Sequence, residues 1–327
     1  MKAQLVHICL FCSIALGCLP AAWAGQMDMP HHRHGPPWGG PIASSQMIHV
    51  GGASIQIDFA PGDLDLPKSD VIQWIETAAR AVSEYYGKFP VARERVLVVP
   101  IADESGVLTG TTWGDVDGFP AFTRMRVGQH TTEQTLANDW TMTHEFVHTA
   151  LPSLSPDHHW LEEGLATYVE PIARAQIGTL SPEQVWGGMV RDMGKGEPQP
   201  GEDGLDNTHT WASTYWGGAL FCLVADVTIR EKTGNKKGLQ DALRGILAAG
   251  GSIADDWPIS KVLDAGDRVT GTTALADLYQ KMGNAPYAPI DLAALWKQLG
   301  IHSDNGKIKF DQNAPLAEIR QAITTPR

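Results

Sequence analysis

The sequence predicts an α+β fold in which a small N-terminal mixed sheet precedes a mainly helical part. Segments with strand-like patterns lie at about 48–130, and helical spacing dominates about 131–327. Strands that come first and helices that come later favour this layout over alternating βαβ units. Of 327 residues, 43% are hydrophobic and 19% charged, which is typical of a globular protein with a full core.

The sheet part is expected to begin near His49. Ile55, Ile57 and Phe59 alternate onto one face, as in a half-buried strand. The segment ERVLVVPIAD predicts a second, buried strand, and two more extended pieces are expected near 106–113 and 120–127.

A helix is expected between the first two strands. Ser69 is its predicted N-cap and Gly87 its stop. Its apolar stripe consists of Val71, Ile75, Ala78, Val82 and Tyr85.

The rest of the chain has helical spacing in most of its length. The expected helices cover 132–150, 161–176, 182–193, 210–232, 237–248, 272–282 and 290–298. The tail GKIKFDQNAPLAEIRQAI predicts a short strand and a last helix.

Residues 1–24 have the pattern of a signal peptide. Lys2 precedes an apolar run, and the A-x-A sequence that ends at Ala24 is a cleavage site. The alternatives are an uncleaved anchor, although the run is short for a span of about 20 residues, and a lipoprotein modified at Cys18. We therefore expect a periplasmic or extracellular protein with no membrane span in the mature chain. Residues 25–47 form a lead-in rich in His, Pro and Gly.

Cysteine usage and charge exclude several classes of function. Cys9, Cys12 and Cys18 lie within the signal, which leaves only Cys222, in the apolar run ALFCLVA. Neither an intrachain disulfide nor a thiolate metal cluster is expected. The formal net charge is −12 and no basic run is present, so nucleic acid is not an expected partner.

The pentapeptide HEFVH carries the strongest chemical signal. His144 and His148 are four residues apart, so on a helix they share a face and both imidazoles can reach one Zn²⁺. Glu145 lies between them, where it can take a proton from a zinc-bound water rather than bind the metal. Thr132 is a plausible cap for this helix.

A third zinc ligand is expected from beyond the motif, because catalytic zinc takes three protein ligands and keeps one position for water. Pro152 and Pro156 end the first helix, and a second begins at WLEEGLATYVEP. The candidates are Glu163, which is well placed, and its rivals His158, His159 and Glu162.

The segments HEFVH and WLEEGLATYVE resemble the gluzincin metallopeptidases, and within them the alanyl-aminopeptidase-like group with its pattern H-E-x-x-H…W-L-N-E-G-F-A. The resemblance implies a thermolysin-like zincin catalytic domain over 48–327. It also implies that Glu163, directly before Gly164, is the third ligand of one Zn²⁺. The gap between His148 and Glu163 is 14 residues, shorter than in that pattern, which puts the family's loop contacts in doubt.

The segment STYWGGALFC resembles the Y-x-K-G-A segment of the same family. This implies that Tyr215 donates a hydrogen bond to the oxyanion of the tetrahedral intermediate. Gly217 stands in place of the lysine, so the match is partial. A packed aromatic ring is the alternative for Tyr215, and His158 or His159 is the alternative oxyanion donor.

The region of Gly118–Gly128 is where the family carries a strand whose glutamate holds the substrate's free amine. This chain has no acidic residue there, so exopeptidase specificity is not supported. We expect an extended peptide to pair with an edge strand near Phe122–Val127.

Supporting roles are predicted for residues near the motif. Thr167 and Glu170 lie on the same helix face as Glu163 and are candidates to accept the second N–H of a ligand imidazole. A solvated position is the alternative for Glu170. Asp139 is expected to be a surface charge on the motif's helix.

Taken together, these features predict a secreted zinc metallopeptidase that acts on peptides or proteins. The alternative is an inactive binding or assembly protein of the cell envelope on a peptidase fold, since fold alone does not imply activity. Hydrolysis of a bond other than a peptide bond is a third possibility.

Overall fold

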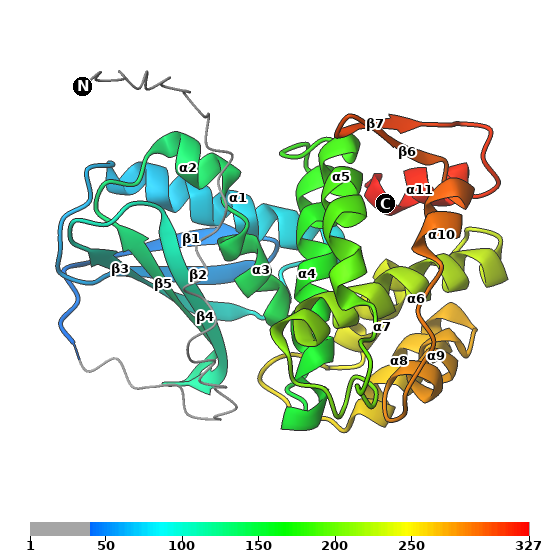
Figure 1. Ribbon diagram of the computed structural model, residues 1–327. Helices are drawn as coiled ribbons and strands as arrows, with labels where there is room; N and C mark the ends of the chain where they lie inside the picture. The colour runs from blue at the N-terminus through cyan, green and yellow to red at the C-terminus, as the bar shows by residue number, and fades with distance from the viewer. Residues whose placement is uncertain (1–39, 327) are drawn as a thin grey trace, which may run out of the picture. The chain divides into compact units, whose positions relative to one another are not determined.

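A five-stranded mixed sheet forms the N-terminal part of the computed structural model, which describes residues 40–326 (Figure 1). Its strands are β1 (Ser44–Val50), β2 (Ala53–Phe59), β3 (Arg93–Ile101), β4 (Val107–Val116) and β5 (Phe119–Gly128). The order is β1-β2-β3-β5-β4, in which β2–β3 and β3–β5 are parallel and the two outer pairs are antiparallel. The predicted signal peptide and most of the lead-in lie outside the described residues.

Strand β1 begins at Ser44, inside the range that was assigned to the lead-in. Its side chains are mostly exposed, so no apolar alternation marks it in the sequence. Backbone pairing with β2 forms it instead, across a turn at Gly51 and Gly52. Both glycines have positive φ (56° and 85°), which a two-residue hairpin turn requires.

Helix α1 (Lys68–Tyr86) connects β2 to β3, and its predicted apolar stripe is buried. The stop at Gly87 is confirmed, since this residue adopts the left-handed conformation (φ 79°). The predicted cap at Ser69 is wrong, because the helix begins at Lys68 after Pro67. The Ser69 hydroxyl donates to Asp70 instead.

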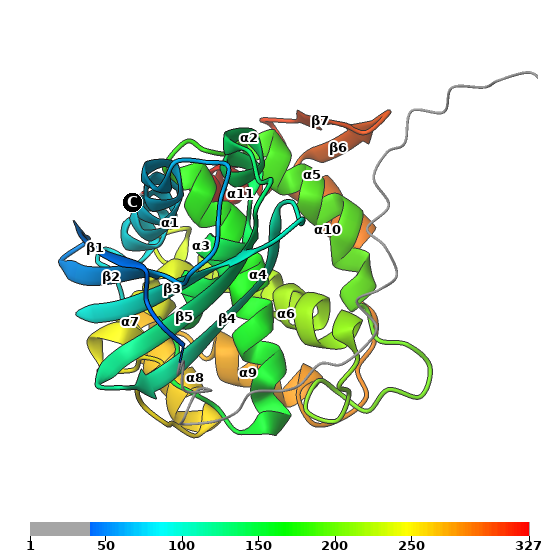
Figure 2. The same ribbon diagram turned by 90° about the vertical axis from the view of Figure 1, so that its left-hand side faces the viewer.

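Two cores lie on opposite faces of the sheet. One face packs against α1 and α3 (Thr141–His148) and contributes Ile55, Val96 and Met125 to the main core (Figure 2). The other face carries a small cluster of Leu97, Trp113, Val116 and Phe122.

The expected α+β class is confirmed, because helices dominate the rest of the described chain. They are α2 (Glu133–Asn138), α3, α4 (His159–Gln176), α5 (Pro182–Asp192), α6 (Gly218–Thr233), α7 (Leu239–Ala248), α8 (Ile259–Thr270), α9 (Ala274–Met282), α10 (Leu292–Gln298) and α11 (Ala317–Thr324). The tail contains a hairpin of two strands, β6 (Ile301–Asp304) and β7 (Lys307–Phe310), where one strand was expected. Helix α8 was not predicted. Gly266 interrupts the apolar pattern of α8, where it packs against Leu275.

The single helix expected at 132–150 is broken into α2 and α3. Thr132 does cap α2, since its hydroxyl accepts from the Thr135 N–H at 3.2 Å. Asp139 lies at the break and accepts from the Met142 N–H at 3.1 Å. It therefore supports the start of α3, and its prediction as a surface charge was wrong.

Helices α4 and α6 cross in backbone contact. Gly164 of α4 faces Gly218 of α6, and a Cβ on Gly218 would overlap the carbonyl oxygen of Trp160. Cys222 lies buried on α6, as expected. The 22-residue stretch Ala212–Thr233 is long and apolar enough to cross a membrane, but 72% of its most apolar window is buried inside the protein, as in a core helix.

We predict that Gly218→Ala lowers the free energy of unfolding by about 2 kcal/mol or more, because the added methyl forces α4 and α6 apart. Gly188→Ala on α5 is the matched control. Only the end of Arg191 lies near that position, so helix propensity should make this change neutral or stabilising by about 0.5–1 kcal/mol. Urea unfolding of both variants measures the difference, and equal effects would contradict the predicted close packing.

Candidate metal centre

Three side chains from α3 and α4 converge on one point. The Nε2 atom of His144 lies 3.0 Å from Oε2 of Glu163, and the Nε2 atom of His148 lies 3.6 Å from the same oxygen. One ligand atom from each of the three lies within 4.8 Å of the others. The i, i+4 spacing puts the two imidazoles on one face of α3, and the packing of α4 against α3 brings Glu163 to them.

The rivals for the third position have other partners. Glu162 accepts from the Leu154 N–H at 3.0 Å and contacts the Nδ1 atom of His159, also at 3.0 Å. The Nδ1 atom of His158 lies 2.9 Å from Asp206, which is 2.8 Å from the Trp160 indole nitrogen. Glu162 and His158 thus fix the start of α4, whereas the Nε2 atom of His159 lies 3.4 Å from Glu163.

The electrostatic environment of the cluster favours a positive charge. Burial alone would lower the pKa of His148, but the Glu163 carboxylate raises it to about 9. Burial alone would raise the pKa of Glu163, but the two imidazoles lower it well below its usual 4.5. A divalent cation would supply the positive charge without protonating the imidazoles, so a His-His-Glu set fits Zn²⁺ in both ligand type and number.

Glu145 lies buried between the ligand helix and the sheet. Its Oε2 atom accepts a hydrogen bond of 2.8 Å from the Thr112 hydroxyl of β4. Burial raises the pKa of Glu145, while the imidazoles of His148 and His144 and the bond from Thr112 oppose this. A Cβ on Gly110 would lie 2.5 Å from Cγ of Glu145, so only glycine leaves room for this carboxylate.

Gly110 and Thr112 were not predicted as site residues. One sequence signal was available, since a glycine inside a strand pattern often marks a close approach of another group. The partner of that approach lies more than 30 residues further along the chain, and no local pattern identifies it.

Tyr215 lies on a π-helical segment, Ala212–Gly217, that runs directly into α6. Such segments occur frequently at functional sites. Its ring stacks on His144, with centroids 6.2 Å apart and planes inclined by 17°. Burial raises the pKa of Tyr215 above its usual 10, and the Glu163 and Glu145 carboxylates add to this, so the phenol keeps its proton. The geometry therefore offers a hydrogen-bond donor beside the cluster.

Thr167 and Glu170 were predicted to accept a hydrogen bond from a ligand imidazole, but neither does so among the described residues. The buried Nδ1 atom of His144 has no hydrogen-bond partner within residues 40–326. Glu170 is buried rather than solvated, and its Oε1 atom accepts from Arg174 at 2.8 Å. No hydrogen bond joins Thr167 to a ligand imidazole in this part of the chain.

The strand at Phe122–Val127 is not an edge, which corrects the predicted peptide-binding position. These residues belong to β5, which pairs with β3 on one side and β4 on the other. Strand β4 is the edge beside Glu145. Its residues from Val107 to Gly114 include no Asp or Glu, and the one acidic residue of the strand is Asp115, near its end at the turn to β5.

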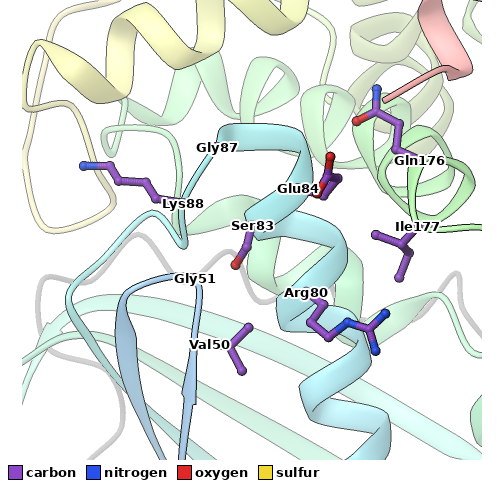
Figure 3. Close-up of a pocket in the computed structure, with 9 residues that line it drawn as sticks. All are labelled: Val50, Gly51, Arg80, Ser83, Glu84, Gly87, Lys88, Gln176 and Ile177. Carbon is purple, nitrogen blue, oxygen red and sulfur yellow. The ribbon is translucent and has the colours of Figure 1, made fainter. Parts of the chain in front are cut away.

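A surface pocket of about 430 Å³ lies elsewhere, between α1 and the end of α4. Figure 3 shows that Arg80 and Lys88 on its wall point in different directions. The two cations therefore do not form a common binding point, and the pocket adds nothing to the metal cluster.

Comparisons with known proteins show that the fold of this chain is similar to that of an aminopeptidase N family protein. No family model matches the sequence, and neither does any curated protein. An aminopeptidase N family protein from Idiomarina loihiensis is similar in structure, with a TM-score of 0.55 and 13% identity over 83% of this chain and 53% of that one. An M1 zinc metallopeptidase from Deinococcus radiodurans has a TM-score of 0.46 and 15% identity over 75% of this chain and 52% of that one. The chain thus spans about half the length of each.

Glu94 on β3 is a second buried carboxyl near the site. Its side chain is fully buried, and Oε1 lies 2.6 Å from the Thr123 hydroxyl in a hydrogen bond. Burial raises the pKa of Glu94 to about 8, with a further contribution from the negative charge of Glu145.

This pKa predicts a pH-dependent stability. The pKa of Glu94 in the folded protein lies above its ordinary value of 4.5. The contribution of protonated Glu94 to the free energy of unfolding is therefore complete below pH 4.5 and is lost as the pH rises towards 8. Relative to Glu94→Gln, the native protein should lose about 1.4 kcal/mol of unfolding free energy per pH unit in this window. Urea unfolding at several pH values tests this, with the exposed Glu183→Gln as a control for the loss of a carboxyl. Parallel curves for native protein and Glu94→Gln would contradict the prediction.

Proposed function

We propose that the protein is a zinc-dependent metallopeptidase that binds one Zn²⁺ through His144, His148 and Glu163. The observation that carries the proposal is the convergence of these three ligand atoms within 4.8 Å, with Glu145 directly after the first of them. The aminopeptidase-like fold supports it.

The residues around the cluster suit hydrolysis of a peptide bond. With zinc bound by these three residues, a water would become a stronger nucleophile and the carbonyl of the scissile bond would be polarised. Glu145 accepts the proton of the attacking water and later gives it to the leaving amine nitrogen. Tyr215 remains protonated and donates to the oxyanion, a contribution of about 2–4 kcal/mol to the transition state.

We place the extended substrate along β4. This strand has a free edge beside Glu145, so a peptide can add to the sheet through main-chain hydrogen bonds. Because Val107–Gly114 carries no carboxylate, nothing on this segment would hold a substrate's free amine. Cleavage inside chains follows as the favoured mode.

The family and the location belong to the same proposal. The H-E-x-x-H…E arrangement supports membership of the gluzincins. The sequence of residues 1–24 supports export to the periplasm or the extracellular space. Peptides or proteins are the proposed partners, and nucleic acid is not one.

His148→Ala and Glu145→Gln together test metal binding and chemistry separately. The native protein, purified without added metal, should contain one zinc per chain, and His148→Ala should lose it. Glu145→Gln should keep the zinc and lower kcat on an unstructured protein substrate by about 10²–10⁴-fold. If the native protein and Glu145→Gln both contain zinc but the native protein hydrolyses nothing, the alternative of an inactive binding protein is favoured.

Gly110→Ala should lower kcat by about tenfold or more while zinc is retained, because the new methyl displaces the Glu145 carboxylate. Gly194→Ala is the matched control, since nothing lies within 4 Å of its Cβ position. Metal analysis and steady-state kinetics measure both variants. Full activity in Gly110→Ala would show that the carboxylate does not need this position.

A further inference from the structure

A continuous line of oxygens runs from Glu94 to Glu145 across three strands. Thr123 on β5 lies 2.6 Å from Oε1 of Glu94, and its hydroxyl is 2.9 Å from that of Thr112 on β4. Thr112 in turn lies 2.8 Å from Oε2 of Glu145, while the backbone carbonyl oxygen of Glu145, 3.2 Å from the same hydroxyl, lies outside this line. The register pairs Thr112 directly with Thr123, so the sheet itself sets this line.

The number of hydrogens in this line determines its protonation. Three oxygen–oxygen contacts need three hydrogens, but the two threonine hydroxyls supply only two. If both carboxyls were ionised, each hydroxyl would turn to its own carboxylate. The contact of 2.9 Å between Thr112 and Thr123 would then hold no hydrogen. A proton on one of the two carboxyls would supply the third hydrogen.

The surroundings assign that proton to Glu94. Its Oε2 atom is buried and has no hydrogen-bond partner among residues 40–326, which is costly for a carboxylate and less so for a neutral acid. Neither carboxyl oxygen of Glu145 is left buried without a partner in the described part of the chain, so the cost of an unpaired oxygen falls on Glu94. With the proton on Oε1 of Glu94, the chain of bonds runs in one direction, from Glu94 through Thr123 and Thr112 to Glu145. With Glu94 ionised, the Thr123 hydroxyl would donate to Glu94 instead.

We propose that Glu94 is a positioning residue which, as a neutral acid, directs the hydroxyls of Thr123 and Thr112 towards Oε2 of Glu145. With Oε2 engaged, Oε1 is the oxygen of Glu145 that exchanges a proton with water and the leaving group. The neutral Glu94 also cannot accept a proton through the threonines, so the proton taken up by Glu145 stays available for the amine. This inference rests on the proposed function for its catalytic consequence, whereas the protonation of Glu94 stands independently.

Infrared spectroscopy of the full-length protein tests the protonation without any assay of activity. At neutral pH the native protein should show the carbonyl band of a protonated carboxyl. Glu94→Gln should lose this band and Glu145→Gln should keep it. If the native spectrum lacks the band, the inference is overturned even if the protein proves to be a peptidase.

Kinetics of the zinc-loaded protein test the positioning role. Thr123→Val has nearly the same shape as the native residue but breaks the line, and should lower kcat by about two- to tenfold with little change in KM. Glu94→Leu should do the same, and the double variant should lose no more than either single one. Glu94→Gln can still donate from its amide, so it should keep kcat within about twofold.

Glu94→Gln and Glu94→Leu together show whether residue 94 acts as a neutral hydrogen-bond donor or as a carboxylate. A loss in Glu94→Gln as large as that in Glu94→Leu would overturn the inference, because the amide replaces a neutral acid but not a carboxylate. If Glu94→Leu does not fold, Thr123→Val against Thr123→Ser makes the same comparison, since serine keeps the hydroxyl. A native chain without peptidase activity would refute the proposed function and leave the infrared result to decide the protonation.

Discussion

The contact between the backbones of α4 and α6 determines where the functional groups meet. Gly164 directly follows Glu163, and Gly218 comes three residues after Tyr215. Because no side chain separates the helices there, the proposed zinc ligand and the proposed oxyanion donor approach the same imidazole, that of His144. Any widening of this crossing would move both groups at once. The precision of the site therefore depends on two residues that take no part in its chemistry.

Three carboxyls with little exposure to solvent lie in this region, and each has a different set of partners. Glu163 lies against two imidazoles, which favour its charge. Glu145 has a hydroxyl donor and the same imidazoles as more distant partners. Glu94 forms no ion pair within residues 40–326, and burial raises its pKa to about 8. The sheet and the α3–α4 helix pair thus place carboxyl groups in different electrostatic environments close to one another.

The local pattern of the sequence was sufficient for features that depend on neighbouring residues. The spacing of His144 and His148 predicts a shared helix face, and the two prolines after them predict a second helix that carries Glu163. Features that depend on strand pairing were missed. The exposed side chains of β1 give no pattern, and the placement of β4 outside β5 is a matter of sheet order. The line from Glu94 to Glu145 needs that order and the register, so the sequence could not predict it.

The π-helical segment has a consequence for how the chain tolerates changes in length. It accommodates one residue more per turn than an α-helix, and Tyr215 lies within it. Deleting a single neighbour, such as Trp216, would let the segment become regular α-helix and would change the direction of Tyr215 relative to α6. Helix content would be preserved and every proposed ligand retained, yet the stacking of the Tyr215 ring on His144 would be altered. In this stretch the number of residues matters as much as their identity, and an alignment gap of one position would carry more functional meaning than most substitutions.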